Sequence, residues 1–312
     1  MKIAVTGALG HIGSALIRAL PAHFPDAEIV LIDNLATQRY PSLFNLPAQG
    51  HYRFIEADVR DADLQRLFAG AFAVVHLAAT TDAAASVGHE METEANNLRA
   101  TQAVANACIA TGARLIHVSS TSVYGTQDGI VSEDCPPDAL RPQSPYAEIK
   151  LKEERLVASG AGEGLKAVTC RFGTIFGVSP GMRFHTAVNK FSWQAAMGQP
   201  LTVWRTAYEQ KRPYLDLADA VRAIAFVIGR GLFDGGIYNV LTLNATVREV
   251  VEALREVAAD VDVTFVDSPI MNQLSYEVSS RRFRDRGFVF AGDIRRGIAE
   301  TMAVLGAAGG RR

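Results

Sequence analysis

Tyr146 and Lys150, in the segment SPYAEIK, are the residues whose types and spacing most directly suggest chemistry. Residues four positions apart share one face of a helix, so the two side chains would be neighbours. A tyrosine hydroxyl has an ordinary pKa of about 10 and is a poor base at neutral pH. A nearby ammonium stabilises the phenolate and lowers that pKa, which would let Tyr146 move a proton. A Tyr-x-x-x-Lys pair alone is also typical of an ordinary helix surface.

Ser120 supports the chemical interpretation of that pair. It follows the apolar run RLIHVS, residues 114–119, where a strand would end. Doubly wound parallel sheets bind their ligands at the carboxyl ends of the strands. The Ser120 hydroxyl could therefore hydrogen-bond a substrate oxygen while Tyr146 moves the proton.

A glycine-rich segment, TGALGHIG at residues 6–13, lies between an apolar run and a helical pattern. Gly7 permits a tight turn, Gly10 lets the backbone approach a pyrophosphate, and Gly13 lets helix and strand pack closely. The free N–H groups at the helix start then bind the anion. The spacing is GxxGxxG rather than GxGxxG, and an ordinary strand-turn-helix connection is the alternative interpretation.

Asp33 ends the second apolar run, EIVLID, twenty residues after Gly13. A carboxylate at this place accepts hydrogen bonds from an adenosine ribose and repels a 2′-phosphate, which favours NAD over NADP. Arg39 lies close by and could accommodate that phosphate, so NADP stays the alternative. Asp33 could also simply begin a loop.

Six apolar runs alternate with helical patterns along the first half of the chain and predict a parallel sheet covered on both faces. Helices are expected at about 12–20, where Pro21 would stop the helix, at 91–111, and from Pro145, with Ser144 as its N-cap. After residue 173 the alternation weakens, with helical patterns near 185–198, 217–229 and 246–260. The expected strands are residues 2–6, 28–33, 52–56, 73–77, 114–119 and 166–171.

The predicted fold class is α/β, a Rossmann-type doubly wound parallel sheet with a smaller C-terminal α/β substrate lobe. Residues 1–172 are expected to form the NAD-binding Rossmann domain, to which the chain returns at about 212–240. Residues 173–312 are expected to form mainly the substrate-binding lobe.

Composition excludes several classes of protein. The 312 residues are 48% hydrophobic, and 31 basic against 33 acidic residues give a net charge of −2, so neither disorder nor a nucleic-acid partner is indicated. Three separated cysteines make no disulfide framework and fit a reducing cytosol. His11, His76 and His117 have no metal-ligand spacing and are expected to be structural.

No apolar stretch reaches the roughly 18 to 20 residues of a membrane span, and MKIAVTGALG is not typical of a signal peptide. A cytoplasmic protein is expected.

Several motifs in this order resemble the extended short-chain dehydrogenases/reductases, and most closely their NAD-dependent nucleotide-sugar epimerase/dehydratase branch. They are TGALGHIG, Asp33, DVRD at 58–61, HLAA at 76–79, SSTSVYG at 119–125 and YAEIK at 146–150. The resemblance implies that Ser120, Tyr146 and Lys150 are catalytic, with Lys150 tuning Tyr146 and holding the nicotinamide ribose. The cationic nicotinamide ring would further stabilise the phenolate. It also implies cofactor contacts from Gly7, Gly10, His11, Ile12, Gly13, Asp33, Asn34, Asp58, Val59, Leu77, Ala78, Ala79, Asn97, Tyr146 and Lys150. Asp58 could instead cap a helix, and Asn97 could be a core amide.

The motifs also depart from parts of that branch. In its 4,6-dehydratases the catalytic Thr is followed by Asp and Glu, which act as acid and base in the elimination of water. Its decarboxylases often have a Glu at the second of these two positions. In this chain Ser120 is followed by Thr121 and Ser122, so both carboxylates are missing. The pattern SSTSVYG is most similar to UDP-glucose 4-epimerase-like members. Thr174 stands where the family often has an Asn that contacts the substrate diphosphate. The stretch 203–219 lacks the family's glycines, but Arg212 fits its phosphate-binding Arg and Arg205 adds a cation. The implied substrate-binding residues are Thr121, Ser122, Thr174, Arg205 and Arg212, although both arginines could be surface residues.

The resemblance implies NAD-dependent 4-epimerisation of a nucleotide-diphosphate sugar through a transient 4-keto intermediate. An NAD(P)-dependent oxidoreductase using the same Ser-Tyr-Lys set, either a 4-keto-sugar reductase or an alcohol dehydrogenase, is the alternative. A non-catalytic NAD-binding sensor is a second alternative.

In relatives, helices equivalent to 91–111 and 145–158 pair into a four-helix bundle, so a homodimer is implied, although these helices could be buried within one subunit. The expected partner is a nucleotide-sugar substrate, with no membrane and no nucleic acid.

Overall fold

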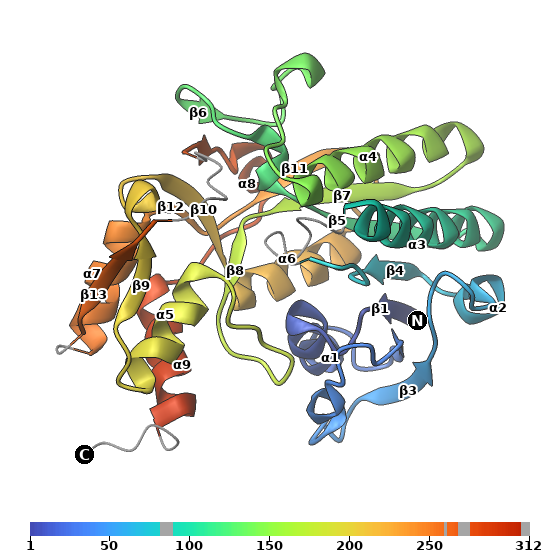
Figure 1. The fold of residues 1–312 in the computed structure, drawn as a ribbon. Coiled ribbons are helices and arrows are strands. Elements are labelled where there is room, and N and C mark those ends of the chain that lie inside the picture. The colour runs from blue at the N-terminus through green and yellow to red at the C-terminus, as the bar shows by residue number, and fades with distance from the viewer. Residues whose placement is uncertain (82–89, 259–260, 268–274, 307–312) are drawn as a thin grey trace.

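The computed structural model describes residues 1–81, 90–258, 261–267 and 275–306 (Figure 1). Within these residues, a seven-stranded sheet with the order β11-β7-β5-β4-β1-β2-β3 forms the centre of the molecule. Every neighbouring pair in it is parallel. Its strands are β1 (Lys2–Thr6), β2 (Glu28–Asp33), β3 (His51–Glu56), β4 (Ala73–His76), β5 (Arg114–Ser120), β7 (Ala167–Phe172) and β11 (Ile237–Val240). The predicted doubly wound α/β fold is confirmed.

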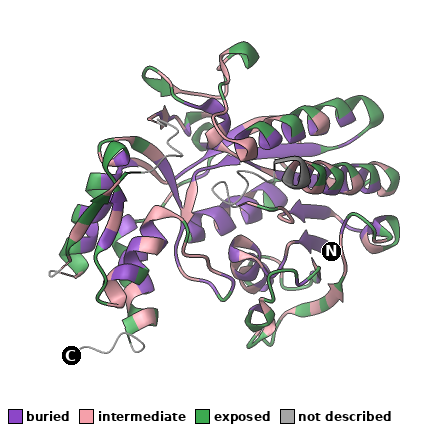
Figure 2. Cartoon of the chain, viewed as in Figure 1, coloured by how far each residue is buried: buried purple, intermediate pink, exposed green. Residues whose placement is uncertain are grey.

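Helices cover both faces of this sheet (Figure 1). One face carries α1 (His11–His23) and α6 (Leu217–Arg230); the other carries α2 (Leu64–Phe68), α3 (Glu90–Thr111) and α4 (Pro145–Ser159). Figure 2 shows most of these strands buried between exposed outer helix surfaces, whereas the edge strand β3 has no buried residue. Because both faces are covered, the inner strands β1, β2 and β4 are largely continuous apolar runs, while the edge strand β3 carries polar residues among its apolar ones.

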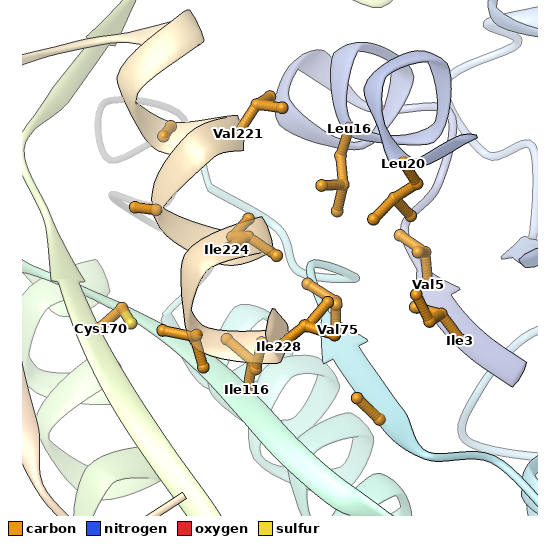
Figure 3. Close-up of a cluster of buried hydrophobic side chains, with 14 of the residues drawn as sticks. Ile3, Val5, Leu16, Leu20, Val75, Ile116, Cys170, Val221, Ile224 and Ile228 are labelled. Atoms are coloured by element: carbon orange, nitrogen blue, oxygen red, sulfur yellow. The ribbon is translucent and has the colours of Figure 1, made fainter. Parts of the chain in front are cut away.

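Alternate residues of each strand enter different cores. Ile3 and Val5 of β1 pack under α1 and α6, whereas Ala4 packs with the helices of the opposite face. Figure 3 shows Leu16 of α1 and Ile224 of α6 pointing toward the strand side chains of the first core. This two-residue period fixes the register of the strands and therefore the place where each strand ends.

A second lobe of shorter strands and further helices lies beside the sheet (Figure 1). Its own apolar core includes Phe176, Leu201, Tyr214, Val250 and Ile298. Its elements are β8 (Thr174–Phe176), α5 (Ala187–Ala196), β9 (Leu201–Trp204), β10 (Lys211–Asp216), β12 (Leu243–Thr246), α7 (Val247–Val257), β13 (Val263–Val266) and α9 (Ile294–Gly306). The described chain also contains the smaller elements β6 (Ile130–Val131), β14 (Glu277–Val278) and α8 (Arg281–Asp285), together with short 3-10 helices.

The chain passes between the two parts more than once. After β8 and β10 it returns to the large sheet through α6 and β11, and then enters the second lobe again at β12. We propose residues 1–172 as the cofactor domain and residues 173–312 as mainly the substrate lobe, with the return at about 212–240. No helix of the described residues is long and apolar enough to cross a membrane.

The prediction that the first helix stops at Pro21 is wrong. Helix α1 continues to His23, with the proline inside it. A proline has no N–H to donate to the carbonyl four residues earlier, here that of Ile17. The hydroxyl of Tyr52, on β3, donates to that Ile17 oxygen at 3.0 Å. A contact from a distant strand therefore satisfies the group that Pro21 leaves unbonded.

Replacing Tyr52 with Phe removes this hydroxyl and leaves the Ile17 carbonyl without its donor. We expect the Y52F substitution to lower the free energy of unfolding by about 1 kcal/mol, the usual net value of one hydrogen bond. Urea denaturation followed by circular dichroism measures it. An unchanged free energy of unfolding would show that the Tyr52 hydroxyl does not support the helix at Pro21.

Candidate active site

A cleft of about 1480 Å³ lies at the carboxyl ends of β1, β2, β4 and β5 and is closed on one side by the second lobe. Pockets for one small ligand usually measure about 300–1,000 Å³, so this cleft has room for a dinucleotide and a second molecule. It lies where strand order reverses between β1 and β4, the place where doubly wound sheets bind ligands.

The glycine-rich turn after β1 forms one wall of the cleft. Gly7 has φ +65°, and a Cβ there would lie 2.6 Å from the backbone nitrogen of Ala78. A Cβ on Gly13 would lie 2.4 Å from the Gly7 carbonyl oxygen, so only glycine lets α1 pack this closely. At Gly10, which is the N-cap of α1 and makes no side-chain capping bond, a Cβ would lie 3.3 Å from the Gly7 carbonyl oxygen. The turn therefore fits a pyrophosphate bound against the helix start.

Asp33, at the end of β2, is anchored to this turn. Its two carboxylate oxygens accept hydrogen bonds from the backbone nitrogens of Leu9 and Leu35, each at 3.0 Å. A carboxylate has about four acceptor positions, so capacity for ribose hydroxyls remains. The half-buried Arg39 lies beside Asp33 and Gly10; burial lowers its pKa and the Asp33 charge opposes that shift. Asp33 thus presents free acceptor positions to the cleft that it lines.

Asp58 lies near Asp33 at the same edge of the cleft. It accepts two side-chain hydrogen bonds from Arg60, at 2.9 and 2.7 Å, and one from Asn34 at 3.0 Å. The Arg60 hydrogen bonds hold the pKa of Asp58 well below its ordinary value. Asp63, rather than Asp58, caps the following helix α2, so the alternative role of Asp58 as that cap is wrong.

Ser120, Tyr146 and Lys150 all line the cleft. Ser144 caps α4 by accepting from the backbone nitrogen of Ala147 at 3.2 Å, and the first helical turns then present Tyr146 and Lys150 on one face. The Lys150 nitrogen lies 6.0 Å from the centre of the Tyr146 ring. Ser120, the last residue of β5, accepts a hydrogen bond from the Ser122 hydroxyl at 2.8 Å, which leaves its own O–H for another acceptor.

Opposing effects act on the pKa of Tyr146. Burial has the largest effect and raises the pKa of Tyr146 above its ordinary value, and the negative charge of Glu153 acts in the same direction. The positive charges of Lys150 and Arg183 lower the pKa, but they do not cancel the increase. Burial also lowers the pKa of Lys150, but Glu153 and Tyr146 oppose this and the pKa of Lys150 ends above its ordinary value. In the protein alone Tyr146 is therefore a phenol next to an ammonium, and a further positive charge is needed to release its proton at neutral pH.

A loop from the second lobe, residues 177–183, packs across the start of α1; we call this loop the strap. The His11 ring bonds the Gly177 oxygen at 2.8 Å, the Ser179 hydroxyl donates to the His11 oxygen at 2.9 Å, and the Gly181 nitrogen donates to the Ser14 hydroxyl at 3.0 Å. Burial lowers the pKa of His11 to about 4, so its ring is neutral at pH 7. At the end of the strap Arg183 contacts the Thr81 hydroxyl.

Most of the residues that the sequence suggested come together in this cleft. The lining includes Gly7, Gly10, His11, Ile12, Gly13, Asp33, Asn34, Asp58, Val59, Leu77, Ala78, Ala79, Ser120, Thr121, Ser122, Tyr146, Lys150, Thr174 and Arg212. Asn97 is buried and bonds both backbone groups of Thr80, as in the core-amide alternative. Arg205 is exposed, lies 3.7 Å from Asp267 and is not among the lining residues.

Sequence reasoning missed Arg183 and Lys190, which also line the cleft. Arg183 is close enough to Tyr146 to lower its pKa. Arg183 ends the strap and Lys190 lies in α5, and no sequence motif marked either residue. Among the described residues, no group of three His, Cys, Asp or Glu side chains could hold a metal ion.

Comparisons with known proteins agree with this geometry. The sequence matches the model of the NAD dependent epimerase/dehydratase family over residues 3–240. It is 29% identical over 96% of its length to a trifunctional UDP-glucose 4,6-dehydratase/UDP-4-keto-6-deoxy-D-glucose 3,5-epimerase/UDP-4-keto-L-rhamnose-reductase of Arabidopsis thaliana, of which it spans 46%. It is 33% identical to a dTDP-glucose 4,6-dehydratase of Streptomyces griseus, over 96% of this chain and 92% of that protein.

The fold is also similar to solved structures. A UDP-glucuronic acid 4-epimerase from Bacillus cereus, in complex with UDP-glucuronic acid and NAD, superposes with a TM-score of 0.88. The two chains are 25% identical, and the similarity covers 99% of this chain and 100% of that one. The predicted family and its NAD cofactor are therefore confirmed. The chain belongs to the NAD dependent epimerase/dehydratase family, whose members include nucleotide-sugar epimerases and dehydratases of the extended short-chain dehydrogenase/reductase type.

Proposed function

We propose that this protein is a 4-epimerase of a nucleotide-diphosphate sugar that works through a transient 4-keto intermediate. The observation that carries the proposal is that Ser120, Tyr146 and Lys150 face a cleft whose described substrate end has no carboxylate. The set of three supports reversible oxidation of an alcohol, and the missing carboxylate disfavours elimination of water.

Elimination of water from a sugar needs an acid and a base beside the reacting carbons. Among the described lining residues, the carboxylates are Asp33 and Asp58, and both lie at the edge where the adenosine half of a dinucleotide would bind. Thr121 and Ser122 stand next to Ser120 instead; Thr121 donates to the Phe172 carbonyl at 3.3 Å and Ser122 to Ser120. Their hydroxyls are too weakly acidic to replace a carboxylate pair, which favours epimerisation over dehydration.

In this mechanism Ser120 donates its free O–H to the oxygen at the 4-position and stabilises the charge that develops there. Tyr146, as phenolate, takes the hydroxyl proton and later returns it. Lys150 stabilises the phenolate from the adjacent turn of α4. NAD, when bound, supplies reversible hydride transfer at carbon 4. Thr174 and Arg212, at the start of β8 and β10, are placed to hold the diphosphate while the keto sugar turns its other face.

Epimerisation leaves the cofactor unchanged after each turnover, so the enzyme has no need to release it. The strap provides a physical basis for retention, because three hydrogen bonds tie it to the helix start against which the pyrophosphate would lie. Gly181 sits so close that a Cβ there would be 2.3 Å from the Leu9 carbonyl oxygen. A net reductase or dehydrogenase must exchange its cofactor in every cycle, and a strap of this kind would slow that exchange.

We also propose a cytoplasmic homodimer that pairs through α3 and α4. These helices pack side by side on one face of the sheet (Figure 1). Sedimentation equilibrium tests the proposal: a mass of two chains supports it, and a single chain at micromolar concentration contradicts it.

Replacing Tyr146 with Phe removes the proton-transferring oxygen and keeps the ring. We expect the Y146F substitution to lower kcat by about 10²–10⁴-fold, the usual contribution of one general acid–base group. NAD bound to the purified protein, measured by mass spectrometry after denaturation, should stay at the wild-type level. Full epimerase activity in Y146F would reject the assignment.

Product analysis separates the epimerase from the alternatives. Incubation with UDP-, GDP-, CDP- and dTDP-sugars, without added cofactor, should interconvert one pair of 4-epimers. Absorbance at the reduced-nicotinamide band should show no net change, since the hydride returns to the sugar. A stoichiometric requirement for added NADH or NADPH would instead establish the oxidoreductase, and binding of NAD without turnover on any of these sugars would establish the sensor.

Replacing Gly181 with Ala tests the strap. Because the new Cβ would meet backbone rather than a flexible side chain, the strap must shift, and we expect NAD to dissociate at least about tenfold faster, a change of about 1.4 kcal/mol. Dissociation is followed by trapping the released cofactor with a NAD-consuming enzyme. Gly162→Ala is the matched control, because a Cβ at that glycine meets nothing within 4 Å. Equal rates in both variants would contradict a retaining role for the strap.

A further inference from the structure

Beneath Tyr146, three ionisable side chains form a buried chain that the mechanism above does not use in full. The Lys150 nitrogen donates to the Glu153 Oε2 at 2.9 Å and to the Val118 carbonyl at 3.0 Å. The same Glu153 oxygen bonds the His117 Nε2 at 3.0 Å. The side chains of Glu153 and His117 are at most 1% exposed, so bulk water does not screen the charge of Glu153.

Comparison with the next residue shows that Glu153 is not an ordinary structural carboxylate. Glu154 is also buried, and both of its oxygens are bonded: to the Ser119 hydroxyl at 2.5 Å and to the Arg171 guanidinium at 2.9 and 2.7 Å. Glu153, in contrast, bonds through Oε2 alone, and its buried Oε1 has no hydrogen-bond partner among the described residues. Burying a carboxylate with one oxygen unbonded costs stability, so Glu153 is less well compensated than Glu154, and its ammonium partner, Lys150, belongs to the candidate site.

We propose that Glu153 is a positioning residue that fixes the Lys150 ammonium and thereby sets the pH range in which Tyr146 exchanges a proton. This inference rests on the proposed function, because it assumes that Tyr146 is the proton-transferring group. Glu153 pulls the ammonium toward β5, and the Val118 carbonyl fixes its second bond. One N–H of the ammonium is then left for a group in the cleft.

The charges around Glu153 come from several elements. Lys150 and Tyr146 face it from α4, His117 from β5 and His76 from β4, while Arg183 of the strap acts on Tyr146. Burial lowers the pKa of His76 to about 3, so that ring is neutral at pH 7. Burial raises the pKa of Glu153, but Lys150 and His117 outweigh burial and bring it to about 2. Glu153 is therefore an anion throughout the working pH range.

This anion has two effects of the same sign. It raises the pKa of Lys150, so the ammonium keeps its charge to higher pH, and it raises the pKa of Tyr146, so the phenolate forms at higher pH. Activity needs the phenolate and the ammonium together, so the pH profile of kcat should be a bell between the two groups. Removing the negative charge should lower both pKa values and move the whole bell toward acid pH.

The test is the pH profile of kcat for Glu153→Gln, with Glu153→Asp as the matched control that keeps the charge. We expect both limbs of the E153Q profile to shift to lower pH by about half a unit or more. E153D should lose part of kcat but keep the wild-type limbs. Glu154→Gln removes a neighbouring buried charge from the same helix, and we expect it to lower the midpoint of thermal unfolding while the acid limb, set by Tyr146, stays in place.

An E153Q profile that is lower but unshifted would overturn the proposal, because it would show a purely structural role. Glu153→Met provides a second variant without the charge should E153Q not fold. If neither folds while E153D does, the carboxylate serves folding and the proposal is wrong. The Y146F variant in the same assay keeps the two hypotheses apart: activity in Y146F rejects the proposed function, whereas an inactive Y146F with an unshifted E153Q rejects this inference alone.

Discussion

The buried ammonium of Lys150 is the feature on which the site depends. It lies between a tyrosine on its own helix, a carbonyl of β5 and the carboxylate of Glu153. An ammonium loses much solvation energy on burial, and only several well-placed acceptors offset that cost. Fixing Lys150 therefore requires the register of β5, the N-cap of α4 at Ser144 and the close packing of that helix on the sheet. Only the N-cap is a local sequence signal, while the register and the packing join residues far apart in the chain.

The cleft combines two different environments. At the edge near β2 and β3 it carries the anions Asp33 and Asp58, both held by hydrogen bonds. Near Ser120 the described lining carries hydroxyls, aromatic rings and the cations Arg183 and Arg212. The first environment suits ribose hydroxyls and the second an anionic diphosphate substrate. The strap connects the two, since the loop that follows β8 of the substrate lobe bonds directly to the start of α1.

Local patterns predicted much of this structure. Apolar runs located six of the seven strands of the large sheet but not the edge strand β11. The glycines at 7, 10 and 13 located the turn, and the four-residue spacing placed Tyr146 beside Lys150. Contacts between distant residues could not be predicted in this way. Tyr52 supports the helix through Pro21, and His117 reaches Glu153 across 36 positions. Asn97 and Arg205 show the same limit, because their residue types suit a ligand but their neighbours in space are Thr80 and Asp267.

The measurement that most directly tests this account is the ionisation of Tyr146 itself, followed by the ultraviolet difference spectrum between wild-type protein and Y146F as pH rises. Without cofactor, burial should keep the tyrosine a phenol to above its ordinary pKa of about 10. With oxidised NAD bound, the added positive charge should bring the titration well below that value. A titration at the same high pH in both states would contradict the account, because Tyr146 would then never be a base at neutral pH.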